Sequence, residues 1–392
     1  MSKTITGALF FLAAGIFTSV TVLSGYQVLF AVPLAFYTWK AVREKDLNLP
    51  ASAWILLAFT AVALLSLLIN FELIPKPSKN FGRLKYFLFG FAGIFVFRHW
   101  LTQVSDKVKR NLMNVFFVSI IAAGLYAVYN FLSMTEGRVK AFTDTMRYGY
   151  GSGMILLVIL SAILQKEKTR NWLDLRLALG ALVVGFVGMY LTYARGALLG
   201  FLCGFPFVLY FYKPKLGLLF GGLSLLAVLT LGGLYLYGSG NHNSRLLMNK
   251  NNTSDGMRRS QWKAAVISIK EKPVLGWGLS NFHSQLKRIK EENDLEFKDY
   301  NDAHSHNLFL EIGSGTGIIG LLIFLGWVLC WALEVFKSDP LTRALIIPFG
   351  VAFVVSSQFE VTFDANNASM IFFLYAISVA HYKPSQKSLR HV

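Results

Sequence analysis

Long hydrophobic segments dominate this sequence, and charged or turn-forming residues bound each of them. Segments of roughly 17–25 apolar residues are long enough to cross a bilayer as helices. The stretch from Ile5 to Trp39 is too long for one span, and Ser24-Gly25-Tyr26-Gln27 is expected to divide it into two short helices. Further candidate spans lie at about 51–72, 84–102, 112–133, 149–165, 176–192, 197–212, 216–238, 306–336, 344–359 and 369–382. The pattern predicts an all-α integral membrane protein with about twelve transmembrane helices.

Composition supports a membrane protein and excludes other classes. Of the 392 residues, 54% are hydrophobic and only 15% are charged, whereas soluble domains carry about a quarter charged residues. Disorder is excluded because aromatic and aliphatic residues are plentiful. The two cysteines, Cys203 and Cys330, lie in apolar segments. They therefore indicate neither a disulfide framework nor a thiolate metal site.

The net charge of +17, from 38 Lys+Arg against 21 Asp+Glu, must be interpreted by location. In a soluble protein this excess would suggest nucleic acid. Here we expect membrane lipids and no nucleic acid, because twelve spans place most basic connections on one side, which the positive-inside rule makes cytoplasmic. These connections hold Lys40–Lys45, Lys107–Arg110, Lys166–Arg176, Lys213–Lys215, Lys337–Arg343 and Lys383–Arg390. The connection with Lys76, Lys79 and Arg83 is basic on the other side and departs from the rule.

One long polar segment, 239–305, lies on the non-cytoplasmic side. Apolar residues recur at helical spacing in Trp262–Ile269 and in Phe282–Ile289, and Gly276-Trp277-Gly278 between them predicts a turn. We expect a small helical cap at the membrane surface. The chain then divides into transmembrane helices 1–9 (residues 1–238), a large non-cytoplasmic helical loop (239–305), and transmembrane helices 10–12 with a cytoplasmic tail (306–392).

Cationic and titratable residues gather at the non-cytoplasmic membrane face. A single arginine at an interface usually extends toward the headgroups as an anchor. Several guanidiniums without matching acidic residues in the membrane segments need an anion, and their paired N–H groups suit phosphate oxygens. The candidates are Arg138 and Arg147, Arg195 in a very short turn, Arg258 and Arg259 early in the large loop, and His304 and His306 where that loop re-enters the membrane.

His306 is either a polar tip in the headgroup layer or a general base, since histidine titrates near neutrality. On a helix, His304 would point elsewhere, so only one of the two is expected to face the arginines. A His-x-His metal pair is not favoured, because no Asp or Glu nearby completes a tetrahedral set. We therefore expect no metal and no cofactor.

Gly315-Thr316-Gly317-Ile318-Ile319-Gly320 fits the dinucleotide pattern G-x-G-x-x-G. That pattern requires a preceding strand, and here it lies within a hydrophobic helix, so we reject it. Gly313 and Gly317 are expected instead to let neighbouring helices approach closely.

Three motifs give the chain a resemblance to the O-antigen ligase family, which is related to O-antigen polymerases and bacterial protein O-oligosaccharyltransferases. Their order, spacing and shared sidedness make the joint match specific, and the similar topology extends it over most of the chain. The motifs are His306-Asn307 followed after nine residues by Gly317-Ile318-Ile319-Gly320; Arg258-x-x-x-Trp262 followed by Pro273-Val274-Leu275-Gly276-Trp277-Gly278; and Tyr193-Ala194-Arg195-Gly196.

The resemblance implies a C-type glycosyltransferase-like membrane fold and metal-independent, inverting transfer of a polysaccharide from undecaprenyl diphosphate to lipid A–core. Transfer would occur at the periplasmic face of the bacterial inner membrane. Carried over by motif, Arg195 and Arg258 would hold the pyrophosphate and His306 would be the catalytic base. Arg138 lies where the family usually has a basic residue. Substrate-binding candidates without a secure counterpart are Arg147, Arg259 and His304, and Asn307 follows the histidine of the motif.

Other functions stay open at this point. An O-antigen polymerase or a protein O-oligosaccharyltransferase would differ from a ligase in its acceptor, for which the sequence has no defining motif. A transporter of a phosphorylated lipid is disfavoured, because polar residues would then be expected near the membrane midplane.

Overall fold

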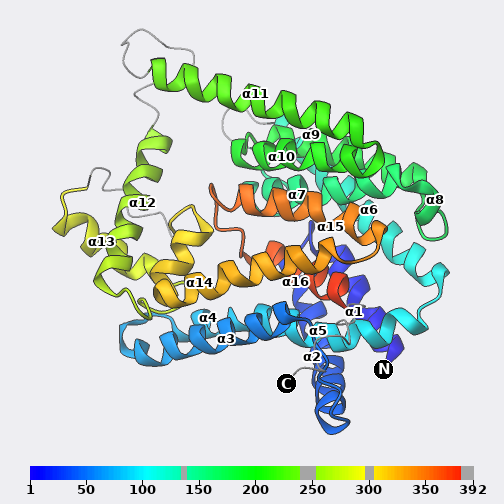
Figure 1. Ribbon diagram of the computed structural model, residues 1–392, viewed down its shortest axis with the longest axis horizontal. Coiled ribbons are helices and arrows are strands. Elements are labelled where there is room, and N and C mark those ends of the chain that lie inside the picture. The colour runs from blue at the N-terminus through cyan, green and yellow to red at the C-terminus, as the bar shows by residue number, and fades with distance from the viewer. Residues whose placement is uncertain (134–138, 239–252, 296–303, 381–392) are drawn as a thin grey trace, which may run out of the picture.

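The computed structural model describes residues 1–133, 139–238, 253–295 and 304–380, with the backbone alone for 227–238 and 253–255 (Figure 1). Helices account for all regular structure in this part of the chain, as the hydrophobic pattern predicts. They are α1 (Ser2–Gly15), α2 (Val20–Arg43), α3 (Ala51–Ile69), a 3-10 turn η1 (Phe71–Leu73), α4 (Pro77–Phe81), α5 (Leu84–Gln103), α6 (Asp106–Ser133), α7 (Thr145–Leu164), α8 (Lys166–Thr169), α9 (Leu175–Leu191), α10 (Arg195–Tyr212), α11 (Pro214–Gly238), α12 (Thr253–Glu271), α13 (Phe282–Glu292), α14 (Leu308–Phe336), α15 (Pro340–Ser356) and α16 (Ala365–Val379).

Every predicted span coincides with a helix of the bundle. Within the described residues, six helices are both long and apolar enough to cross a membrane, namely α2, α3, α6, α7, α10 and α14. Shorter apolar helices are α9, α15, α16 and the described first half of α11. The chain is therefore an all-α membrane protein, and the total of about twelve crossings stays a prediction.

The predicted break between the first two helices is wrong. The chain turns at Ile16–Ser19, and residues 24–27 lie inside α2. Ser19 is the reason, because its backbone is extended and its side chain accepts a hydrogen bond from Val22 N (3.4 Å). A serine that caps the first turn in this way starts a helix, whereas Ser24 donates to Val20 O (3.0 Å) within an established one.

Hydrogen bonds between connections show which helix termini share an end of the bundle. Asn367 Nδ2 at the start of α16 donates to Arg147 O at the start of α7 (3.3 Å). Asn366 Nδ2 donates to Ile16 O just after α1 (2.7 Å). We call this end, where α14 also begins and which lies to the left in Figure 1, the α14 end.

The predicted cytoplasmic connections meet at the opposite end. Arg98, near the end of α5, donates to Asn48 O (2.6 Å) and to Ala380 O (3.0 Å). Arg110, in the first turn of α6, donates to Asn171 O in the connection before α9 (2.8 Å). These contacts agree with the shared sidedness of the basic connections, while the membrane side that they face stays a prediction.

The basic connection that departs from the positive-inside rule lies at the α14 end. Arg83, just before α5, donates from Nη1 to Phe363 O in the connection between α15 and α16 (2.8 Å). This cation therefore joins two connections of the protein. This hydrogen bond gives Arg83 a structural role at the α14 end, which the positive-inside rule does not take into account.

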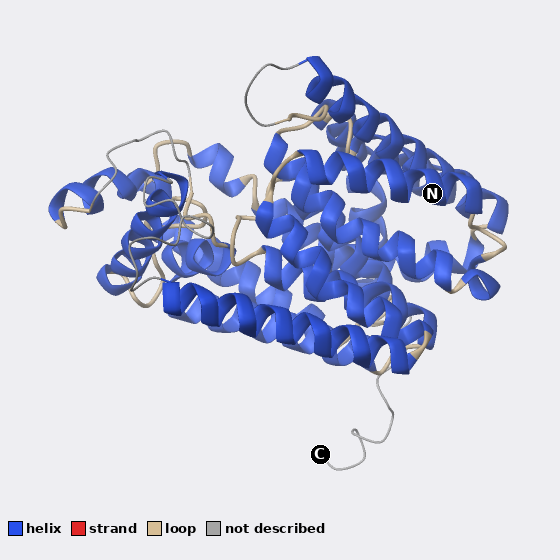
Figure 2. Ribbon diagram, turned by 90° about the horizontal axis from the view of Figure 1, so that it is seen from above, coloured by secondary structure: helices blue, strands red, loops and turns tan. Residues whose placement is uncertain are grey.

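The large polar segment forms a helical cap beyond the ends of α3 and α14 (Figures 1 and 2). Helices α12 and α13 pack through a small hydrophobic core of Ala264, Ala265, Phe282, Leu286 and Ile289. Arg288 then joins them on the outside through Glu271 (2.5 Å). The described part of segment 239–305 thus has the predicted helices.

Helix α14 is interrupted at Gly317, where φ is 69° and ψ is −173°. The turn Pro273–Gly278 from the cap occupies the interruption. Trp277 N donates to Ser314 O (3.0 Å), Gly278 N to Gly315 O (2.9 Å), and Ile318 N to Pro273 O (2.7 Å). Backbone groups that lose their helical partners at the interruption are thus satisfied by the turn.

Two expectations about this glycine-rich segment need correction. The segment is not a continuous helix, and Gly317 does not serve the packing of two helices. A Cβ atom at Gly317 would lie 2.2 Å from Val274 O, so this glycine makes room for the turn from the cap. Rejection of the dinucleotide site stands, because a helix rather than a strand precedes the pattern.

We expect Gly317→Ala to destabilise the protein by at least about 1–3 kcal/mol, because its dihedral angles are reserved essentially for glycine. Gly350→Ala in α15 is the matched control, since nothing lies within 4 Å of its added Cβ atom. Thermal unfolding in detergent, followed by size-exclusion chromatography, measures both. Equal stability of the two variants would contradict the assigned role of Gly317.

Candidate functional site

The start of α14 is tied to the connection between α15 and α16. Asn307 Oδ1 accepts from Phe309 N (3.0 Å) and Leu310 N (3.1 Å), which caps the helix. The same side chain donates from Nδ2 to Gln358 O (3.2 Å). Leu308 N donates to Ser357 O (2.8 Å). We call residues 357–364 the site loop, because it also carries the carboxylate described next.

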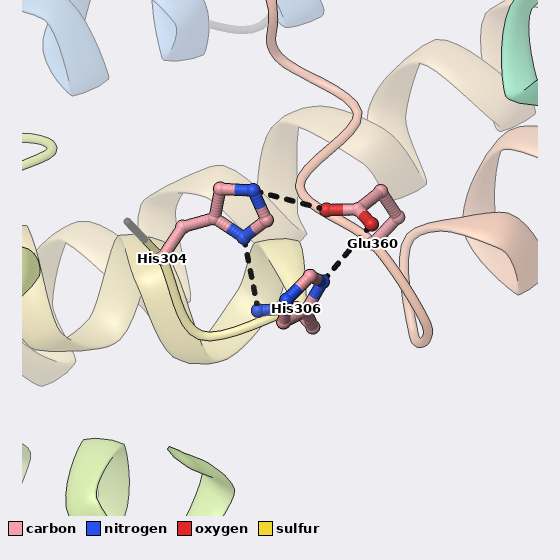
Figure 3. Close-up of side chains that lie close together, drawn as sticks. All are labelled: His304, His306 and Glu360. Atoms are coloured by element: carbon pink, nitrogen blue, oxygen red, sulfur yellow. Dashed lines mark hydrogen bonds and ion pairs between the residues drawn. The ribbon is translucent and has the colours of Figure 1, made fainter. Parts of the chain in front are cut away.

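His306 and His304 both contact Glu360 of the site loop (Figure 3). His306 Nδ1 lies 3.0 Å from Glu360 Oε2, and His304 Nε2 lies 3.4 Å from Glu360 Oε1. The carboxylate side chain is 7% exposed, whereas the imidazoles are 19% and 35% exposed respectively. The buried carboxylate of Glu360 therefore contacts two imidazoles that are accessible to solutes.

Local hydrogen bonds give the histidine turn its shape. Ser305 N donates to Glu311 Oε2 (3.0 Å), and Ser305 Oγ donates to Asn307 O (2.7 Å). His306 has a φ of 50°, a left-handed conformation that is uncommon for residues other than glycine. Such conformations concentrate at functional sites, so the backbone is a further reason to place His306 in the site.

Partners determine the charge state of Glu360. Burial alone would raise the pKa of its carboxyl group, but the hydrogen bond from His306, the charges of His304 and His306, and the N–H of Val361 outweigh that effect. The pKa of Glu360 is consequently held below its usual range, and the group is a carboxylate at neutral pH. When His306 Nδ1 carries the ring proton it donates to this carboxylate, and Nε2 is then the basic nitrogen.

Two premises about the histidines are wrong, namely that they lie on a helix and that no acidic residue is near them, while the expectation that only one of them faces the arginines stays a prediction. His304 and His306 precede α14 and are not helical, so both side chains reach the same carboxylate. An acidic residue near the pair is also present, because the fold brings Glu360 to it from 54 residues further along the chain. The stated reason against a metal, that no acidic residue completes the set, therefore fails.

Arg195 contacts the site loop through its own turn. Tyr193, with a φ of 52°, reverses the chain, and Arg195 begins α10 as an exposed residue. An added Cβ atom at Gly196 would lie 2.7 Å from the Cβ atom of Phe359, the neighbour of Glu360. The turns that carry Arg195 and His306 thus pack against adjacent residues of one loop.

Arg147 lies within electrostatic range of Asp364, an acidic residue of the site loop. Asp364 caps α16 through Asn366 N (2.9 Å). Burial raises the pKa of Asp364 to about 6, although hydrogen bonds from Asn367 and the positive charge of Arg147 act in the opposite direction. Arg147 therefore lies beside the site loop, close to one of its two acidic residues.

The remaining sequence candidates are less closely gathered. Arg258 is half-buried and Arg259 exposed on α12, which packs against α14. A role for either in the site stays a prediction. Arg138 lies outside the described residues. The amide oxygen and nitrogen of Asn307 both bond to the protein, and its expected place among the substrate-binding residues stays a prediction.

Sequence reasoning missed Glu360, Asp364 and Arg83. The two predicted spans 344–359 and 369–382 leave both acidic residues in one short connection on the same side of the membrane as His306. This shared side could have indicated that Glu360 and Asp364 lie near the histidine. Arg83 was noticed only as an exception to the sidedness rule. Its bond to Phe363 O was not accessible from the sequence.

Comparison with known proteins agrees with this picture. The helices define a polytopic membrane protein with a histidine–carboxylate pair at one end of the bundle. Residues 180–325 match the family model described as O-antigen ligase, which supports membership of that family. An uncharacterized protein of Haemophilus influenzae strain Rd is 24% identical over 283 residues, which cover 66% of this chain and 69% of that protein.

We expect Asn307→Ala to lower stability by about 0.5–2 kcal/mol through loss of the α14 cap. Asn307→Asp keeps an oxygen for the cap and loses only the bonds that Nδ2 donates to Gln358 O and Oε1, so it should retain more of the stability. Detergent unfolding midpoints of the two variants measure this difference. An alanine variant as stable as the wild type would show that the cap does not hold the start of α14.

Proposed function

We propose that the protein is an O-antigen ligase that transfers a polysaccharide from undecaprenyl diphosphate to lipid A–core. The proposal places the reaction at the periplasmic face of the bacterial inner membrane. The match to the O-antigen ligase family supports the class of reaction. The single observation that carries the mechanism is the pairing of His306 Nδ1 with the buried Glu360 carboxylate at 3.0 Å.

In the proposed reaction His306 is the general base. An acceptor sugar hydroxyl gives its proton to Nε2 while its oxygen forms a bond to the anomeric carbon of the donor. Glu360 holds the ring through Nδ1 and stabilises the imidazolium that results, as the carboxylate does in a serine-protease triad. Attack from the face opposite the leaving group inverts the anomeric centre.

The leaving group is a diphosphate, and negative charge accumulates on it as the anomeric bond breaks. Arg195 and Arg258 are proposed to bind these oxygens, because arginine donates two parallel hydrogen bonds to phosphate. Contacts that strengthen as the charge develops lower the barrier rather than only tightening binding. The exposed position of Arg195 at the start of α10 is compatible with this role.

The acceptor distinguishes the proposed ligase from an O-antigen polymerase or a protein O-oligosaccharyltransferase. Purified protein mixed with lipid-linked polysaccharide and lipid A–core should give a mass shift of the lipid A–core, and the shift should persist with a chelator. If the polysaccharide is transferred only to another polysaccharide or to a protein, the protein is instead an O-antigen polymerase or a protein O-oligosaccharyltransferase. Movement of lipid across liposomes without covalent transfer would favour a transporter.

We expect His306→Ala to lower the rate of transfer by about 10²–10⁴-fold, the usual contribution of a general base. Glu360→Gln should lower it by at least about tenfold, since an amide cannot stabilise the imidazolium by charge. His283→Ala, an exposed histidine on α13, is the matched control and should remain near the wild type. Full activity of purified His306→Ala would remove it from the mechanism.

Arg195→Ala and Arg258→Ala are expected to fold normally and to lose most transfer activity. Arg195→Lys keeps the charge but not the paired N–H groups, so its rate should fall between those of the alanine variant and the wild type. Rates at saturating donor separate transition-state contacts from ground-state binding. An unchanged rate in either alanine variant would exclude that residue from pyrophosphate binding.

A further inference from the structure

We propose that His304, His306 and Glu360 bind one transition-metal dication of the Zn²⁺ type, and that this ion inhibits the protein. Each residue offers one nitrogen or oxygen, and these three atoms lie within 4.8 Å of one another. Tetrahedral zinc with bond lengths of about 2.0–2.2 Å has ligands about 3.3 Å apart. The contacts from His306 Nδ1 to Glu360 Oε2 (3.0 Å) and from His304 Nε2 to Glu360 Oε1 (3.4 Å) are near that separation but end on different carboxylate oxygens. A set with one atom from each residue, within 4.8 Å in the unbound site, must therefore contract when an ion binds.

The identity of the ligands selects the class of ion. Two imidazoles and one carboxylate suit Zn²⁺, Co²⁺, Ni²⁺ or Cu²⁺, whereas Mg²⁺ and Ca²⁺ prefer an all-oxygen set. Three protein ligands leave one position of a tetrahedral ion for water. Because His304 and His306 are partly exposed, an ion can enter from the solvent side and reach the carboxylate between them.

The surroundings hold the ligands in place before an ion arrives. Glu360 Oε1 accepts from Val361 N (2.9 Å), and both histidines lie on the turn that leads into the cap of α14. His306 N contacts His304 Nδ1 at 3.4 Å, a long contact that a small rotation of the ring would break. An ion must also displace ring protons, so its affinity should fall as the pH is lowered.

Inhibition follows from the chemistry of His306 and rests on the proposed function. An ion at Nδ1 takes that nitrogen from Glu360 and leaves the ring proton on Nε2, which is then a donor and no longer a base. An ion at Nε2 blocks the basic nitrogen directly. In both cases the acceptor hydroxyl loses the group that would take its proton. Binding of the ion itself does not depend on the proposed function.

The binding test uses the full-length protein in detergent, freed of metal and purified with a tag that contains no histidine. Zn²⁺ is titrated in competition with a chromophoric chelator, and binding of Co²⁺ is followed by visible absorption. We expect one site per chain, at least tenfold weaker in His304→Ala and in Glu360→Gln and unchanged in the control His283→Ala. Excess Mg²⁺ should not displace Zn²⁺.

Equal Zn²⁺ affinity in the wild type, His304→Ala and Glu360→Gln would overturn the site. Size-exclusion profiles verify that each variant is folded. His304→Gln provides a second test of the same ligand if His304→Ala does not fold. A site that Mg²⁺ fills equally well would also overturn the proposal, because its ligands would not then be imidazoles.

The inhibition test measures transfer against Zn²⁺ concentration, with each variant normalised to its own metal-free rate. Wild-type transfer should fall at the concentrations that fill the site and recover with chelator, and His304→Ala should need at least tenfold more Zn²⁺. Zn²⁺ that binds without slowing transfer would overturn the inhibitory role. A metal-free wild type without transfer would overturn the proposed function instead, while the titration would still decide the metal site.

Discussion

The buried carboxylate of Glu360 is the group around which the candidate site is organised. A carboxylate removed from water is strongly unfavourable unless cations and hydrogen-bond donors replace its hydration. His304, His306 and the N–H of Val361 provide that replacement. Because the same contacts fix the imidazole rings, stabilisation of the buried charge and orientation of the proposed base are one physical requirement. The site loop must therefore keep its position relative to the start of α14.

The interruption of α14 connects the cap to this position. At Gly317 the helix exchanges its own backbone hydrogen bonds for bonds to the turn Pro273–Gly278, so the cap is joined to the segment that begins at His306. Helix α12, which carries Arg258, leads directly into that turn. Two family motifs distant in sequence, the glycines of the turn and those of α14, are thus complementary surfaces of a single contact.

Charge in the site is more nearly balanced than the arginine-rich sequence suggests. Arg147 lies beside Asp364, Arg83 bonds to the carbonyl of Phe363, and Glu360 faces two histidines. Arg83 and the two histidines therefore contact the site loop directly. Arg195 is exposed on a turn that packs against the same loop.

Hydrophobic segment length determined the helical membrane architecture, and motif spacing indicated the resemblance to the O-antigen ligase family, because each is a local property of the chain. The helical spacing of apolar residues in the large polar segment likewise predicted helices α12 and α13. Tertiary structure alone decided that Glu360 meets both histidines and that Gly317 receives a turn rather than a helix. Those outcomes depend on packing between segments 37 to 56 residues apart. Neither hydrophobic periodicity nor residue type encodes which distant backbone or carboxylate will fill a given space.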